Sequence, residues 1–294
     1  RRRHTRLRTV TGVQTCALPI FPNSVLASGT WYRIGITRGG VCKLDYNFFN
    51  SMGIDMASLD PRKIRIYGNG AGQLPYSNSG RHKDDLLENA IFVQGESDGV
   101  FDNSDYVLFY GVASDKWSYD STAGHQHFHH QVNNYCDTSY YFINTDLGNG
   151  KRIQLQSSSS LAETDTVTTF DEHLYHELDQ VNLIKSGREW YGEMFDIINQ
   201  YSLTFSFPNI DMSTNATVEA DLVSDFESFP HDYTVNAQTG SSTIHVAATV
   251  PGCYYCCVAE EGSTKFSFAP TGSAITVTIA KPANAQDAVG YLNW

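Results

Sequence analysis

The run SLTFSF, residues 202–207, alternates apolar and hydroxyl side chains along its whole length. Leu203, Phe205 and Phe207 fall on one side of an extended chain, and Thr204 and Ser206 fall on the other, because successive side chains of a strand point to opposite faces. Such alternation predicts an antiparallel strand with one buried face and one wet face. The stretch therefore favours a β-sandwich.

The same pattern recurs through the second half of the chain, with polar or glycine-containing stretches between the strands. Strands are predicted at TVEADLV (217–223), YTVNA (233–237), STIHVAATV (242–250), TKFSFA (264–269) and AITVTIA (274–280). We expect residues 169–294 to form a jelly-roll-like β-sandwich domain. The run VGYLNW (289–294) stops in mid-strand, so we expect this domain to be truncated at its C-terminal strand.

The first half is also rich in short aromatic strands. TWYRIGI (30–36), the turn 38–40 and VCKL (41–44) predict a hairpin, and Asp45 caps a short helix that ends at Gly53. Further strands are expected at 63–68, 90–95, 106–111 and 139–145. The prediction is an all-β protein with one or two short helices, in which a β-rich domain (21–156) and a linker (157–168) precede the sandwich.

Residues 1–20 resemble the translation of an indexed Illumina sequencing adapter rather than a protein sequence. We expect the natural chain to begin near Phe21, so an arginine-rich arm or targeting segment is the rejected alternative. Without the five arginines of this stretch the net charge changes from -12 to -17. This acidity argues against nucleic acid as a partner. No apolar run reaches the roughly 18 residues of a membrane-spanning helix, which predicts no transmembrane span.

The loop GESDGVFDNSDY (95–106) holds Glu96, Asp98, Asp102 and Asp105 around a glycine. Several oxygen ligands on a tight turn suit a calcium ion, although the spacing differs from that of the EF-hand. Asx turns within a hairpin explain the same residues structurally. Calcium is the one cofactor that the sequence suggests, and the structural turn is the favoured alternative.

The segment GHQHFHH (124–130) places His125, His127 and His129 on one face of a strand, which suits zinc or copper if a fourth ligand is present. A solvated histidine-rich loop or strand edge is the favoured alternative. The pair Cys253 and Cys256 lies in a strand-like run and predicts a structural role. No catalytic residue is predicted, because the chain has no G-x-S-x-G motif and no cysteine-protease signature.

Residues 170–196 fit neither helix nor strand cleanly, and we favour strands on either side of residues 186 and 187. This stretch contains HELDQVNLIKSGREWYGEMF, which resembles the signature of the type IX secretion system sortases of Bacteroidetes, a family of gingipain-like cysteine peptidases. Segments of the first half resemble the same family in order and spacing. The matching positions, to which we assign a structural role, are Glu177, Asp179, Asn182, Ser186, Gly187, Arg188, Glu189, Trp190, Gly192 and Glu193.

The resemblance implies the non-catalytic N-terminal region of a sortase in the cell envelope, in the periplasm or at the outer-membrane surface. In that family a downstream domain cleaves the C-terminal sorting signal of secreted cargo and transfers the cargo to anionic lipopolysaccharide. The implied partners are cargo proteins and other secretion components. The alternative is a carbohydrate-binding or adhesion module, in which Trp117, Tyr254 and Tyr255 supply stacking faces.

Overall fold

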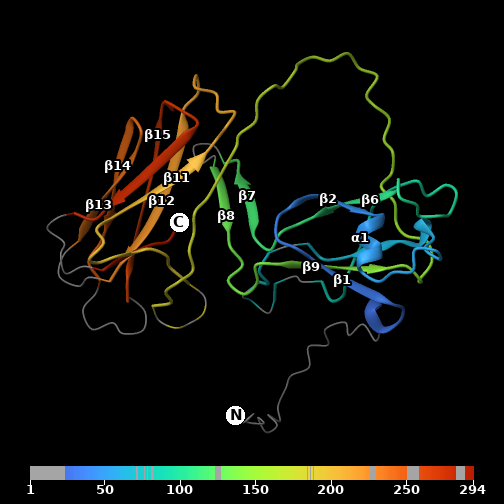
Figure 1. Ribbon diagram of the computed structural model, residues 1–294. Coiled ribbons are helices and arrows are strands. Elements are labelled where there is room, and N and C mark those ends of the chain that lie inside the picture. The colour runs from blue at the N-terminus through green and yellow to red at the C-terminus, as the bar shows by residue number, and fades with distance from the viewer. Residues whose placement is uncertain are drawn as a thin grey trace, which may run out of the picture. The chain divides into compact units, whose positions relative to one another are not determined.

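The computed structural model describes residues 24–70, 72–75, 77, 79–80, 83–122, 127–183, 185, 187, 189–225, 230–249, 258–282 and 289–294 (Figure 1). The chain divides into two compact units. One comprises the chain up to Lys116 together with Gln131–Ser159, and the other comprises Trp117–His130 together with Ser160–Trp294. Antiparallel strands dominate both units, which confirms the all-β class. The domain boundaries inferred from the sequence stay predictions.

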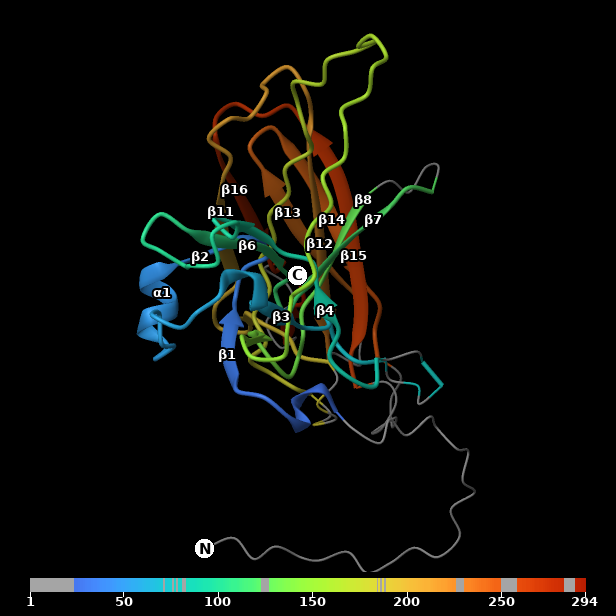
Figure 2. The same ribbon diagram turned by 90° about the vertical axis from the view of Figure 1, so that its right-hand side faces the viewer.

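Two antiparallel sheets build the first unit (Figure 2). One has the order β1 (Trp31–Ile36), β9 (Ser139–Asn144), β3 (Arg65–Tyr67) and β4 (Glu88–Asn89), and the other has the order β2 (Gly40–Asp45), β6 (Tyr106–Gly111) and β5 (Phe92–Gln94). The helical elements are α1 (Tyr46–Ser51) and the 3-10 turns η1 (Val25–Ala27) and η2 (Pro61–Lys63). Both sheets and α1 contribute apolar side chains to one core, which includes Phe49, Ile66, Phe101, Val107 and Ile143.

The predicted hairpin of residues 30–44 is wrong. Strand β1 pairs with β9, whereas β2 pairs with β6, so the two predicted partners belong to different sheets. The chain between them passes from one sheet to the other because strands on both sheets contribute apolar side chains to the same core, as Ile34 of β1 and Leu44 of β2 do. By contrast, Asp45 caps α1 as predicted, since its carboxylate accepts the Phe48 N–H at 2.9 Å.

Two four-stranded antiparallel sheets face each other in the second unit and form the predicted sandwich. One has the order β10 (Met194–Phe195), β17 (Gly290–Leu292), β12 (Ala216–Ser224) and β15 (Glu260–Phe268). The other has the order β11 (Gln200–Ser206), β16 (Ala274–Ala280), β13 (His231–Ala237) and β14 (Gly240–Val246). Buried Phe195, Leu222, Tyr233, Ile244 and Ile279 lie between the sheets.

A separate two-stranded sheet, β7 (Lys116–Asp120) with β8 (His127–Gln131), was not predicted. It includes the end of the histidine-rich segment, whose side chains are less apolar than those of the other strands. None of the helices in the described part of the chain has the length and apolarity that a membrane crossing requires.

Candidate functional site

The signature stretch folds into a closed loop in the second unit. Val181 and Tyr191 form an antiparallel bridge, with N–H to O distances of 2.9 and 2.8 Å in the two directions. Within the loop, the Asn182 side chain donates to the Glu189 carbonyl at 2.8 Å. Gly187 adopts φ +72, a conformation that favours glycine. Ser186 and Arg188 lie outside the described residues, and Trp190 is half-buried.

Glycine at position 192 lets this loop dock on the sandwich. Its N–H donates to the Leu292 carbonyl at 2.7 Å, and the Leu292 N–H donates to the backbone carbonyl of Glu193 at 3.0 Å, which extends the pairing of β10 with β17. A Cβ at Gly192 would lie 2.9 Å from the carbonyl oxygen of Leu178. The signature therefore contains a glycine where two backbone segments approach closely.

Immediately before this loop, the chain packs against the β7–β8 hairpin. Six rings meet there, which we call the aromatic–histidine cluster: Trp117, Tyr119, Phe128, His130, His173 and Tyr175. His173 stacks on Phe128 with ring centroids 4.1 Å apart, and Tyr175 stacks on His130 at 3.4 Å. Trp117 contacts both imidazoles, at 4.2 Å from His173 and 4.6 Å from His130. Ring contacts thus fasten residues 173–175 to the hairpin.

Carboxylates of the signature lie beside two histidines. The Glu177 carboxylate is 3.6 Å from Nδ1 of His130, whose side chain is only 7% exposed. His176 and Glu193 are closer, with 2.7 Å between Nε2 and Oε1. Partial removal from water, together with the negative charge of Glu177, raises the pKa of the Asp179 carboxyl, although that residue retains exposed surface. These pairs connect the signature to the cluster and to β10.

A second group of acids surrounds Tyr191. Burial and the nearby charges of Glu189, Glu261 and Asp221 raise the pKa of the Tyr191 hydroxyl to about 12. Asp221 is 3% exposed, and burial together with a hydrogen bond to Glu261 raises the pKa of its carboxyl. Asn293 donates to the same carboxyl at 2.9 Å. Burial and the neighbouring Glu261 thus favour the protonated form of this carboxyl, next to the signature loop.

The candidate calcium ligands occupy the loop between β5 and β6, which pair as the predicted hairpin. Each carboxylate has a local partner: Glu96 pairs with Arg152, Asp98 accepts from the Val100 N–H, Asp102 accepts from Ser104, and buried Asp105 accepts from the Asp102 N–H. Across the described residues no set of three acid, histidine or cysteine side chains is arranged to hold a metal ion. Calcium binding stays a prediction.

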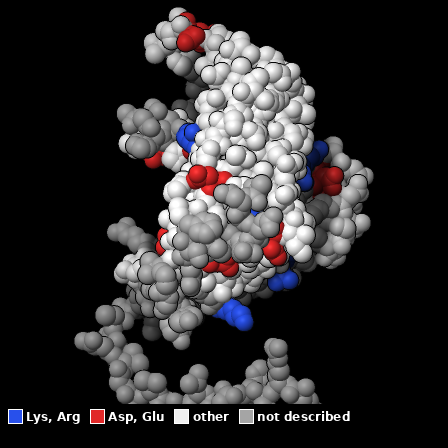
Figure 3. Space-filling view, turned by 90° about the vertical axis from the view of Figure 1, so that its left-hand side faces the viewer, with Lys and Arg blue, Asp and Glu red and all other residues white. Residues whose placement is uncertain are grey.

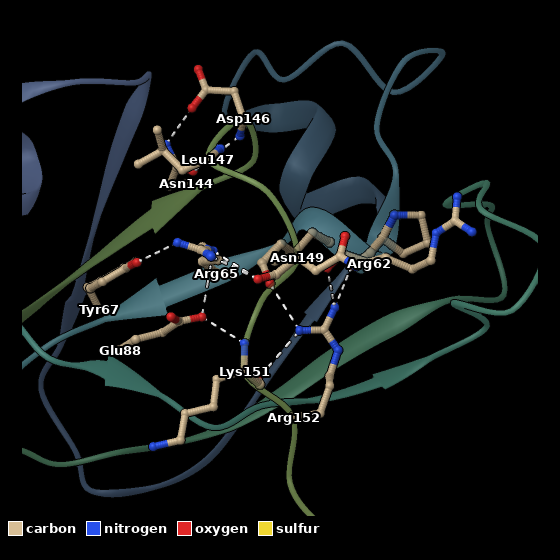
Figure 4. A network of polar contacts seen from close by, with 12 residues as sticks. Arg62, Arg65, Tyr67, Glu88, Asn144, Asp146, Leu147, Asn149, Lys151 and Arg152 are labelled. Atoms are coloured by element: carbon tan, nitrogen blue, oxygen red, sulfur yellow. Dashed lines mark hydrogen bonds and ion pairs between the residues drawn. The ribbon is translucent and has the colours of Figure 1, made fainter.

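Arg152 anchors that loop through Glu96, and its other nitrogens reach backbone carbonyls at the end of η2 (Figure 4). Its Nε lies 2.7 Å from Glu96, and its Nη2 donates to the carbonyls of Pro61 and Arg62 at 2.9 Å each. Nη1 donates to the Ile64 carbonyl at 3.2 Å. Figure 4 also shows Arg65, whose guanidinium bonds Asn149 and approaches Glu88 in the same network. The network satisfies backbone carbonyls at the end of η2.

The histidine-rich segment divides between two faces of β8. His127 and His129 are separated by Phe128, and it is Phe128 and His130 whose rings join the aromatic–histidine cluster. His125 lies outside the described residues, as do the tyrosines at 254 and 255. Trp117, the third residue assigned to sugar stacking, packs against His130, His173 and Tyr175 instead of presenting an open face.

Among solved structures, dimeric latent PorU from Porphyromonas gingivalis is similar to this chain, with a TM-score of 0.72 and 20% sequence identity. The chain has a PorU-like fold. The likeness covers 92% of this chain and 24% of that PorU chain, so this chain spans about a quarter of its length. An insecticidal delta-endotoxin from Bacillus thuringiensis has a TM-score of only 0.27 at 9% identity, with coverage of 82% and 42%, which supports no argument. No protein-family model and no curated protein matches the chain.

The residues of the signature-like stretch stand out in the sequence, but the contacts of the segment before it do not. His173 and Tyr175, which precede the signature, contact β7 and β8 across more than forty residues of intervening chain. The available signal was the alternation of ring-bearing residues at 173, 175, 128 and 130, which indicates a shared face only when the two segments are known to be adjacent.

Proposed function

We propose that this chain is the non-catalytic, β-rich N-terminal region of a type IX secretion sortase. The observation that supports the proposal most is the likeness of nearly the whole chain to a portion of latent PorU. The resemblance of residues 177–193 to the family's signature supports it independently, since it depends on the residues and not on the fold. The region acts as a scaffold in the cell envelope, where it docks secreted cargo and other secretion components.

In this proposal the chemistry belongs to a gingipain-like cysteine peptidase domain downstream of Trp294. That domain cleaves the C-terminal sorting signal of the cargo and transfers the cargo to anionic lipopolysaccharide. The described residues contribute structural contacts instead: Asn182 closes the signature loop, Gly192 docks it, and Glu193 pairs with His176. Loss of these contacts would misplace the loop without removing a reacting group.

Sequencing the parent gene past the codon for Trp294 tests the assignment directly. We expect the reading frame to continue into a gingipain-like α/β domain with a cysteine and a histidine as its catalytic pair. A frame that continues into an unrelated domain would overturn the proposal.

A chimaera tests the scaffold role. In this chimaera, residues 24–294 replace the corresponding region of the sortase in a Bacteroidetes strain. Removal of the sorting signal from a cargo protein then measures cargo processing. We expect the chimaera to restore processing and Gly192→Ala to reduce it, because the new Cβ displaces the signature loop. Gly272→Ala, at a position with no atom within 4 Å of the new Cβ, is the matched control. Equal effects of both variants would contradict a role for the loop.

A further inference from the structure

The outward face of the sheet β11-β16-β13-β14 consists almost wholly of short, uncharged polar side chains. We call it the hydroxyl face. All of its members are exposed except the half-buried Thr278: Gln200, Ser202, Thr204 and Ser206 on β11, Thr276 and Thr278 on β16, Thr234 and Asn236 on β13, and Ser241 and Thr243 on β14.

Strand register arranges these side chains in rows across the sheet. Ser202 lies opposite Thr278, which lies opposite Asn236, which in turn lies opposite Ser241. The Ser202 and Thr278 hydroxyls are 3.1 Å apart, and those of Thr204 and Thr276 are 2.9 Å apart. The hydroxyls are thus held in fixed positions, each with remaining capacity to donate or accept a hydrogen bond.

Charge is nearly absent from this face, although the chain carries 32 acids and a net charge of -12. The exception is Asp232, whose carboxylate lies 2.6 Å from Nδ1 of His245 at one end of the sheet. The opposite sheet of the same sandwich has the ion pair Glu219 and Lys265 at 2.7 Å, with Glu261 nearby on its outward face. Figure 3, which views the molecule from the left-hand side of Figure 1, shows a broad area without charged atoms, with acidic and basic side chains at its borders.

The side chains of the face limit the classes of ligand that it can bind. Polyanions require basic side chains, and the face has none. Sugar stacking requires aromatic rings, which are also missing from the outward positions of these strands. Hydroxyl and amide groups both donate and accept hydrogen bonds, so they match a neutral polymer whose own polar groups are hydroxyls.

Its area argues against a protein partner. Strand spacings of about 4.8 Å across and 3.3 Å along give four strands of seven residues a face of roughly 400 Å². A standard protein interface buries about 800 Å² of accessible surface on each partner, so a protein partner would have to extend beyond this face. A single extended polymer chain lying across the strands fits the available area.

We propose that the hydroxyl face binds a neutral polysaccharide, whose sugar hydroxyls exchange hydrogen bonds with the rows of serine, threonine and asparagine side chains. This binding function is distinct from the scaffold role and does not depend on it. Either one can hold if the other fails.

Affinity electrophoresis of the whole chain tests the proposal, in native gels that contain laminarin, mannan or dextran, with polygalacturonate as the anionic comparison. We expect at least one neutral polysaccharide to retard the chain and polygalacturonate to leave it unaffected. The double variant Thr204→Val/Thr276→Val should weaken the retardation at least fivefold, because valine keeps the shape and strand propensity but removes the hydroxyls. Asn236→Lys should weaken it as well.

The matched control is Thr217→Val on the opposite sheet, where an exposed threonine also bonds a cross-strand hydroxyl, that of Ser267, at 2.9 Å. It should retain full binding, and circular dichroism melts should show that every variant folds. Failure of all three neutral polysaccharides to retard the chain would overturn the proposal. So would retardation by polygalacturonate alone, equal losses in Thr217→Val and the double variant, or dimerisation through this face in sedimentation.

Discussion

The Arg152 guanidinium and the Glu96 carboxylate form an ion pair in which Nε and Oε2 are 2.7 Å apart. The other two nitrogens of the guanidinium donate to backbone carbonyls of residues 61, 62 and 64. One side chain therefore joins the turn η2, the segment after β9 and the acidic loop between β5 and β6.

Replacement of Arg152 by lysine should destabilise the first unit even though the positive charge remains. A single ammonium cannot reach all the acceptors that the planar fork reaches, so carbonyls of η2 lose their partners. We expect a loss of about 2–4 kcal/mol in the free energy of unfolding. Urea unfolding measures it, with Lys151→Ala as the control because that side chain is exposed. A loss below that of the control would contradict the anchoring role.

Gly192→Ala should destabilise the second unit, because the added methyl group would meet the Leu178 backbone at 2.9 Å. Relief requires the signature loop to move away from β17, and we expect a cost of about 1–3 kcal/mol. Gly272→Ala has open space around its new Cβ and should change stability little. Thermal melts that shift equally for both variants would rule out the close approach as the reason for the glycine.

Asp221 makes stability depend on pH. Its pKa rises from 3.8 in the unfolded chain to about 8 in the folded one, so the folded state holds the proton more tightly. The contribution of the Asp221 carboxyl to the free energy of unfolding is therefore present at low pH and is lost as pH rises from about 4 to about 8. Asp221→Asn, which keeps the Asn293 contact, should be more stable than the parent at pH 8 by on the order of 1–3 kcal/mol.

Asp211→Asn is the control, because the pKa of the Asp211 carboxyl is shifted in the opposite direction. Hydrogen bonds from Ser213 lower the pKa of the Asp211 carboxyl, so its contribution is present at neutral pH and is lost as pH falls through that pKa. This variant should gain nothing at pH 8. If Asp221→Asn and the parent show parallel stability curves between pH 4 and 8, the buried carboxyl is not the cause of the dependence.

His173→Ala should loosen the β7–β8 hairpin, because the imidazole stacks on Phe128 and contacts Trp117. The Trp117→Phe variant assigns the indole N–H resonance of Trp117. In His173→Ala we expect this resonance to shift and the hydrogen exchange of the indole N–H to accelerate. Leu174→Ala changes the adjacent, exposed side chain and should leave the resonance in place. An unshifted resonance in His173→Ala would show that the cluster does not hold the hairpin.

Local sequence patterns predicted much of the fold. The alternation in 202–207 and in the later runs placed β11 to β16 within a few residues, and Asp45 marked the start of α1. These features depend on neighbours in the chain, namely the period of two in a strand and a cap that bonds three residues ahead.

Contacts between distant segments could not be predicted in the same way. Strand β1 pairs with β9 more than a hundred residues later, although a glycine turn offered it β2 as a local partner. Strands β7 and β8 were missed because their side chains pack on His173 and Tyr175 instead of forming a separate apolar face.

The sequence by itself determined the class of the protein, an acidic all-β chain with a sandwich in its second half, because burial on one strand face imposes an alternating pattern that can be read locally. Only the tertiary structure decided which strands pair, that Glu96 belongs to Arg152, that Trp117 packs beside His173, and that serines and threonines from four strands form one face. Each of these depends on the packing of segments far apart in the chain, and no local pattern encodes that packing.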